Sequence, residues 1–122
     1  MMRIRQNKNE YLLTGRQEIM EFKEIENKVL KTAEDYCEKY NIKLDEDFAV
    51  LKLYEEVGEL AQSILIHRKK CRPEKYLSEE ESKKELGKEL ADVLGLLIMV
   101  SHLLDVDLED ALNKKWIERT NK

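Results

Sequence analysis

The chain has 122 residues, a length typical of one domain that can bury a core of its own. It carries 26 acidic and 22 basic residues, and the net charge of −4 does not favour binding to nucleic acid. The one dense basic segment, 68–72, is short. Charged residues make up 39% of the chain, with one proline and four glycines, which is typical of a helical protein with few turns rather than a β-sandwich.

The sequence also indicates a cellular compartment. Cys37 and Cys71 show no paired spacing, which favours reduced thiols in a cytoplasmic protein. The first ten residues lack the apolar core of a secretory signal. The most apolar segment, 90–104, is about fifteen residues long, whereas a helix that spans a bilayer needs roughly 20. We therefore expect a cytoplasmic protein without a membrane segment.

Apolar residues that recur at helical intervals predict four helices. Residues 1–13 are expected to be a polar tail, followed by a single domain over 14–122. Thr14 and Gln17 form a potential capping box at the start of a long amphipathic helix over 16–41. The outer face of this helix is rich in Glu and Lys, which we interpret as a solvated surface.

The second helix is predicted over 46–69, with Asp45 or Asp47 as its N-cap. A loop over 70–77, which contains Pro73, follows it.

Ser78 and Glu81 form another capping box, which opens a third helix ending near residue 104. Its segment 90–104 is apolar almost all the way round and should be covered on every side. Asp107 is a plausible N-cap for a fourth helix over 108–119. The predicted architecture is an all-α, four-helix bundle.

Two acidic clusters lie on the second and third predicted helices. Offsets of three and four residues place each cluster on one side of its helix. The clusters are Glu55, Glu56 and Glu59 on the second helix, and Glu85, Glu89 and Asp92 on the third. A solvated acidic face is the ordinary interpretation of such a pattern. Both helices also have broad apolar arcs, however, and an unpaired charge beside a core is costly. We therefore favour a divalent cation between the two helices.

The residue types in these clusters indicate which metal would bind. Carboxylates without nearby Cys or His are hard oxygen ligands that favour Mg²⁺, with Mn²⁺ as a substitute. A di-iron bundle would need two Glu-x-x-His motifs. The residues three positions before His67 and His102 are Ile64 and Met99, so this class of site is excluded.

Magnesium bound by carboxylates on an open face commonly also binds phosphate oxygens. The corresponding reaction class is metal-assisted attack of water on phosphorus. Such chemistry needs cations near the phosphates, and Lys52, Lys114, Lys115 and Arg119 are candidates. For the last three, ordinary charge complementarity at a helix C-terminus is an equally good explanation.

Three segments carry a family resemblance: 53–60 (LYEEVGEL), 89–94 (ELADVL) and 107–112 (DLEDAL), the last followed by Lys115. Together they resemble the MazG-like nucleotide pyrophosphohydrolases of the all-α NTP pyrophosphatase superfamily, with its E-E-x-x-E and E-x-x-D helices. The resemblance extends roughly over residues 48–119. It implies hydrolysis of a nucleoside triphosphate between the α and β phosphates, which yields a monophosphate and pyrophosphate. A role in removing non-canonical nucleotides would be consistent with such an activity.

The resemblance also implies roles for individual residues. Its Mg²⁺ ligands correspond to Glu56, Glu59, Glu89 and Asp92. Glu55 corresponds to a residue that assists these ligands or the attacking water, so Glu55 and Glu56 are the implied catalytic pair. Lys115 corresponds to a lysine that contacts phosphate, and Lys52 is a further candidate. Many relatives have an Asn one helical turn after that lysine, where this chain has Arg119, and Asn121 follows two positions later.

Relatives of this type assemble as dimers or tetramers, which would cover apolar faces that one thin bundle leaves open. Dimeric dUTPases and phosphoribosyl-ATP pyrophosphatases share the carboxylate scheme and remain alternatives. The base pocket that would separate these enzymes has no signature in the sequence. A non-catalytic helical interaction protein is a further alternative, although the intact set of five acidic residues argues against it.

Overall fold

The computed structural model describes residues 19–118, and these residues form helices and connecting turns without a β-strand. The α-helices are α2 (Phe22–Lys39), α3 (Glu46–His67), α4 (Glu79–Leu103) and α5 (Leu108–Leu112). The all-α prediction is therefore confirmed. Within the described range, no helix combines the length and apolarity that crossing a membrane requires.

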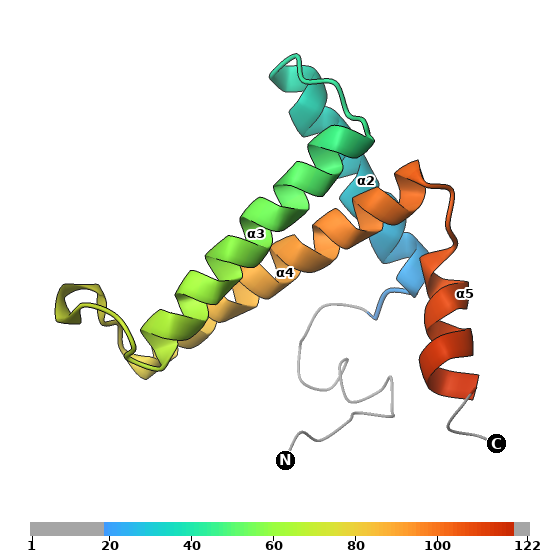
Figure 1. Cartoon of the computed structure of the whole chain (residues 1–122). Coiled ribbons are helices and arrows are strands. Elements are labelled where there is room, and N and C mark those ends of the chain that lie inside the picture. Colours follow the sequence, from blue (N-terminus) through green and yellow to red (C-terminus); the bar gives the residue numbers. More distant parts are fainter. Residues whose placement is uncertain (1–18, 119–122) are drawn as a thin grey trace.

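The centre of the fold is an antiparallel hairpin of α3 and α4, which make the most extensive helix–helix contact (Figure 1). The loop between them contains a short 3₁₀ turn, η1 (Pro73–Lys75), at the far end of the hairpin. At the opposite end, α2 crosses the hairpin and packs against α4. The short α5 lies beside the beginning of α2, where Lys23 Nζ is 2.7 Å from Asp107 Oδ1.

Three helix starts have the N-caps that the sequence predicts. Asp45, Ser78 and Asp107 each accept a hydrogen bond from the backbone N–H three residues further on, at 2.9, 3.1 and 3.0 Å. Of the two candidates before α3, Asp45 is the one that caps the helix. Ser78 also donates a hydrogen bond to Glu81 Oε1 at 2.9 Å, which reinforces the predicted box. Local side-chain chemistry thus fixes where α3, α4 and α5 begin.

After each of three helices, a residue other than glycine adopts the left-handed conformation. Asn41, Lys69 and Asp105 follow α2, α3 and α4 with φ values of 53°, 56° and 55°. In each case the next residue donates its backbone N–H to the carbonyl five positions earlier, at 2.8 Å. This is the Schellman pattern, which satisfies carbonyls at the end of a helix and turns the chain sharply.

The first helix starts later than predicted. Residues Ile19–Glu21 are not helical, and α2 begins at Phe22 rather than at residue 16. Apolar periodicity defines the buried face of a helix but does not fix its first residue. The predicted capping box at Thr14 and Gln17, the tail over 1–13 and the domain boundary at 14 lie outside the described residues.

The last helix also differs from its prediction over 108–119. The α-helical part ends at Leu112, and the chain continues as a π-helical turn, η2 (Asn113–Ile117). A wider helical turn of this kind does not change the hydrophobic spacing enough to be recognised from sequence.

The core lies where the three long helices meet. Its most buried apolar side chains are Cys37 of α2, Ala49 of α3, and Ile98 and Met99 of α4. Both cysteines are free thiols. The expectation that segment 90–104 is covered on every side is wrong for a single chain, because α2 and α3 leave part of α4 open. The apolar side chains that remain about half exposed in this segment are Leu90, Leu94 and Leu97 of α4 and its C-cap Leu104.

Candidate metal and nucleotide site

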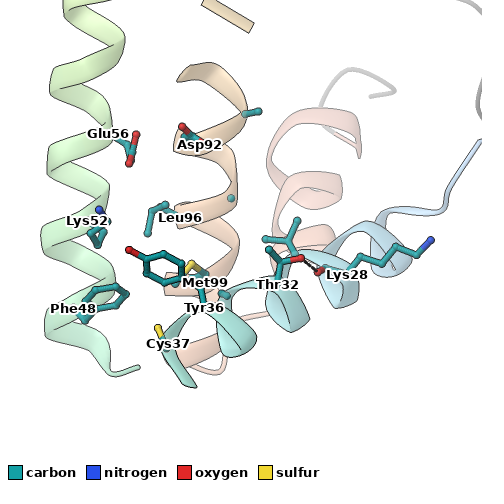
Figure 2. A pocket seen from close by; sticks show the side chains of 14 residues that line it. Lys28, Thr32, Tyr36, Cys37, Phe48, Lys52, Glu56, Asp92, Leu96 and Met99 are labelled. Atoms are coloured by element: carbon teal, nitrogen blue, oxygen red, sulfur yellow. Dashed lines mark hydrogen bonds between the residues drawn. The ribbon is translucent and has the colours of Figure 1, made fainter. Parts of the chain in front are cut away.

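The two acidic clusters meet across the α3/α4 hairpin. Figure 2 shows the carboxylates of Glu56 on α3 and Asp92 on α4 pointing toward one another. Two groups of carboxylates have oxygen atoms within 4.8 Å of one another, and Glu56 belongs to both. The groups are Glu55, Glu56 and Glu59, and Glu56, Glu89 and Asp92. The structure therefore brings together the five acidic residues that the sequence analysis singled out for metal binding and catalysis.

Burial of Glu56 and of one oxygen of Glu89 separates this cluster from an ordinary acidic surface, although Glu55, Glu59 and Asp92 are exposed. Glu56 is 9% exposed, and its Oε2 atom is buried without a hydrogen-bond partner. Glu89 Oε2, on the opposite helix α4, is likewise buried without a hydrogen-bond partner. A third buried oxygen of this kind, Glu26 Oε1, lies 3.5 Å from Lys23 Nζ and so has a cationic neighbour. A buried carboxylate oxygen without a donor is costly, and a cation between the two helices would relieve that cost.

The pKa values of Glu56 and Glu89 also indicate that ionised carboxylates are unfavourable here. Burial raises the pKa of Glu56 to about 7, and the neighbouring carboxylates of Glu59 and Asp92 contribute to the increase. Burial likewise raises the pKa of Glu89, again with contributions from Glu59 and Asp92. Lys52 acts in the opposite direction on Glu56, but it does not compensate. A cluster of oxygen ligands that resists ionisation on its own fits a hard divalent cation such as Mg²⁺.

Two lysines neutralise the periphery of the clusters. Lys52 Nζ lies 2.6 Å from Glu55 Oε1 on the exposed side of α3. On α4, Lys88 Nζ lies 3.4 Å from Glu85 Oε1. Glu85 is thus paired within its own helix and belongs to neither carboxylate group.

The cations expected from the C-terminal helix are not close to this cluster. Lys115 belongs to η2, which lies apart from the middle of α3 in Figure 1. Lys114 pairs with Asp110 at 2.9 Å. Arg119 lies outside the described residues. Phosphate binding by Lys115 and Arg119 therefore stays a prediction, and the described part of one chain does not bring Lys115 to the acidic cluster.

A cavity of about 590 Å³ opens beside the carboxylates and is lined by α2, α3 and α4 (Figure 2). This volume is within the range of about 300–1,000 Å³ that is typical of small-molecule sites. Glu56, Asp92 and Lys52 form the edge that it shares with the acidic cluster. The rings of Tyr36 and Phe48 and the thioether of Met99 form another part of its lining. The carboxylates therefore border a largely apolar space.

The family comparison agrees with the acidic hairpin. A model of the MazG nucleotide pyrophosphohydrolase domain matches residues 45–122, which is more than half of the chain. The chain belongs to the MazG family. No curated protein and no solved structure matches it. The MazG segment contains α3 and α4 with all five carboxylates, and it begins at Asp45, the N-cap of α3.

The MazG segment does not include α2, and the sequence analysis missed the contribution of this helix to the site. Tyr36, on α2, is 50% exposed and lines the cavity. Gly95, three residues after Asp92, was not singled out, and it also lines the cavity. A glycine inside a long helix, one turn from one of the clustered carboxylates, was the available signal.

Proposed function

We propose that this MazG protein is a Mg²⁺-dependent nucleoside triphosphate pyrophosphohydrolase. It would hydrolyse the bond between the α and β phosphates and release a nucleoside monophosphate and pyrophosphate. The observation that carries this proposal is the pair of buried, unpartnered oxygens, Glu56 Oε2 and Glu89 Oε2, in a carboxylate cluster beside a nucleoside-sized cavity. A triphosphate is itself strongly anionic, so it could approach these carboxylates only together with cations.

The Mg²⁺ ligands would come from both helices of the hairpin: Glu56, Glu59, Glu89 and Asp92. Bound Mg²⁺ supplies positive charge that screens the phosphate oxygens and acidifies the attacking water, and Mn²⁺ can substitute for it. Because the ligands are held on two packed helices, they are positioned before the substrate arrives. Preorganised charge of this kind lowers the barrier without reorganisation during the reaction.

Glu55 would act on the attacking water. It adjoins Glu56 and Glu59, and its side chain is 54% exposed on the open side of α3, where water has access. In the proposed step, the water oxygen forms a bond to the α phosphorus while its proton passes to Glu55. The bond from the α phosphorus to the bridging oxygen breaks, and pyrophosphate leaves with that oxygen. Lys52, now paired with Glu55, would contact the phosphates on the same side.

The cavity would hold the nucleoside. It shares Glu56, Asp92 and Lys52 with the acidic cluster, so a phosphate chain at the carboxylates leads directly into it. Its aromatic side chains offer surfaces on which a base can stack. This placement would put the α phosphate at the boundary between the cavity and the metal ligands.

A homodimer or homotetramer in the cytoplasm completes the proposal. Besides the exposed leucines of α4, the α3 side chains Leu51, Tyr54, Val57 and Leu65 are also exposed. Apolar surface of this extent is typical of a protein interface. A second copy of the chain would cover it, and it could also bring Lys115 or Arg119 to the phosphates.

The proposed reaction can be tested with Mg²⁺ and a panel of canonical, deoxy and damaged nucleoside triphosphates, extended to dUTP and phosphoribosyl-ATP. Hydrolysis in ¹⁸O-labelled water should place the label in the monophosphate, because water attacks the α phosphorus. Label in pyrophosphate would show attack at the β phosphorus. Release of inorganic phosphate alone, or no turnover with any member of the panel, would contradict the proposal.

A further inference from the structure

The chemistry of the cavity beside the carboxylates indicates how a nucleobase would be selected there. Its interior is formed by the rings of Tyr36 and Phe48, the thioether of Met99 and aliphatic side chains of α2 and α4. The occupant follows from continuity with the acidic cluster, because Glu56 and Asp92 belong to both. A nucleotide whose phosphates lie at the carboxylates has its nucleoside in this cavity, so the inference rests on the proposed function.

Most polar side chains of the cavity are already engaged elsewhere. Thr32 Oγ1 donates a hydrogen bond to the carbonyl of Lys28 at 3.0 Å (Figure 2). Lys28 points away from the cavity in the same view, and its Nζ lies 3.4 Å from Glu24. Lys52 is held at 2.6 Å by Glu55. None of these three groups is free to recognise a base.

The remaining polar groups of the lining cannot pair with all the donors and acceptors on the edge of a base. Among the described residues, the lining contains no Asn or Gln, and its two carboxylates, Glu56 and Asp92, belong to the acidic cluster. The Tyr36 hydroxyl and the Cys37 thiol are left, whereas each base presents several donors and acceptors on one edge. The backbone groups of the surrounding helices are occupied by helical hydrogen bonds.

We infer that this cavity selects the base by size and stacking rather than by hydrogen bonds to the base edge, and that Gly95 sets its depth. An apolar pocket distinguishes ligands of similar shape by only about 10- to 200-fold, whereas a pocket that hydrogen-bonds the substrate can reach about 10⁴- to 10⁵-fold. The protein should therefore accept canonical and edge-modified bases of the same size. Bases of different size should be distinguished more strongly.

Gly95 lines the cavity from α4 without a side chain of its own. A Cβ atom built there would lie 3.8 Å from Val29 Cγ1 of α2, an ordinary van der Waals contact. Alanine therefore fits without displacement, and a longer side chain would extend into the space between α2 and α4. Gly87, two turns earlier on α4, has no atom within 4 Å of such a Cβ and does not line the cavity. It provides a matched control on the same helix.

The first arm of the test compares purines that differ only at the base edge. We expect kcat/KM for dATP and dITP to differ by less than about 100-fold. Gly95→Leu should lower kcat/KM for these purines by roughly tenfold or more, and less for dCTP, while Gly87→Leu changes neither. Gly95→Ala should lower kcat/KM for the purines by a smaller factor. This variant keeps the test valid if Gly95→Leu does not fold. A preference above about 10⁴ between dATP and dITP, or equal kinetics for Gly95→Leu and the wild type, would overturn the inference.

The second arm separates this inference from the proposed function. Deoxyadenosine and deoxycytidine, which carry no phosphate, are titrated into the protein while backbone amide resonances are followed. Shifts at Phe48 and Gly95 without hydrolysis of any triphosphate would support the cavity assignment and contradict the proposed function. Hydrolysis without shifts at these residues, together with a changed oligomeric mass for Gly95→Leu, would show that the cavity is an interface between copies. That result would overturn the inference and leave the proposed function standing.

Discussion

Glu56 on α3 and Asp92 on α4 point their carboxylates at one another across the hairpin, although 36 positions separate them in the sequence (Figure 2). Together with Glu89, their oxygens lie within 4.8 Å of one another. Like charges at such distances repel, and burial strengthens the repulsion. The hairpin therefore maintains an arrangement that costs stability unless a cation or protons neutralise it.

Magnesium should stabilise the folded protein. In the proposed site, Mg²⁺ would bind the carboxylate cluster only when the hairpin is formed, so mass action should raise the free energy of unfolding by about 2.7 kcal/mol at an Mg²⁺ concentration of 100 times Kd. Thermal unfolding followed by circular dichroism, with NaCl matched for ionic strength, measures this effect. Glu56→Gln should abolish most of the increase, and Glu80→Gln, at the exposed start of α4, should retain it. An equal response of both variants would favour a solvated acidic face.

The metal-free protein should lose stability as pH rises from about 4.5 to 7. In the folded state the pKa of Glu56 is raised from 4.5 to about 7, so the folded protein binds more protons than the unfolded chain in this window. The stabilisation is complete below pH 4.5 and is lost as pH passes 7. The raised pKa of Glu89 acts in the same direction. Urea unfolding at several pH values in EDTA tests this dependence.

Two comparisons identify the source of this pH dependence. Glu56→Gln should flatten the decline, because the amide does not ionise. Saturating Mg²⁺ should also oppose the decline, because the cation favours the ionised carboxylates. A metal-free wild type whose stability rises through this pH window would contradict the assignment.

The N-cap of α4 should contribute to stability independently of any activity. Ser78→Ala removes the acceptor for the backbone N–H of Glu81 and should cost about 1 kcal/mol. Ser78→Asp keeps an acceptor at the N-terminus of the helix and should recover most of the loss. Urea unfolding of the two variants measures the difference. Equal destabilisation by both variants would show that the hydrogen bond does not carry the effect.

The exposed apolar face of the hairpin should mediate self-association. Leu94→Lys places a charge on this face and should lower the molar mass in solution to that of one chain, 14.5 kDa. Light scattering coupled to gel filtration gives the mass directly. Lys83→Glu, on an exposed part of the same helix, is the control and should leave the assembly unchanged. A wild-type protein that is already monomeric at micromolar concentration would contradict the oligomer.

Local signals made the hairpin predictable. Asp45, Ser78 and Asp107 act within their own helices, so a cap can be recognised from a few neighbouring residues. The spacing of the carboxylates is also a local signal, because offsets of three and four residues place side chains on one face of a helix. That both faces meet across the hairpin followed from the family resemblance and from the need to neutralise charge beside the core.

Features that depend on contacts between distant segments were harder to predict. The crossing of α2 brings Tyr36 to the cavity, and no local pattern in α2 encodes this crossing. The uncovered leucines of α4, such as Leu94, could not be recognised either, because an apolar stripe has the same sequence whether its own chain or a second copy covers it. Lys115 illustrates the same point, since it belongs to η2, which lies apart from the middle of α3 in Figure 1.

The most direct test of the account is Mg²⁺-dependent release of pyrophosphate from a nucleoside triphosphate by the wild type, Glu56→Gln and Asp92→Asn. Even changes in groups that surround a metal ligand cost about 10- to 100-fold, so loss of a ligand should lower kcat/KM by about 100-fold or more. Both variants should keep the helical circular dichroism of the wild type, and Glu80→Gln should keep its activity. Folded variants that release pyrophosphate at the wild-type rate would contradict the metal site between α3 and α4.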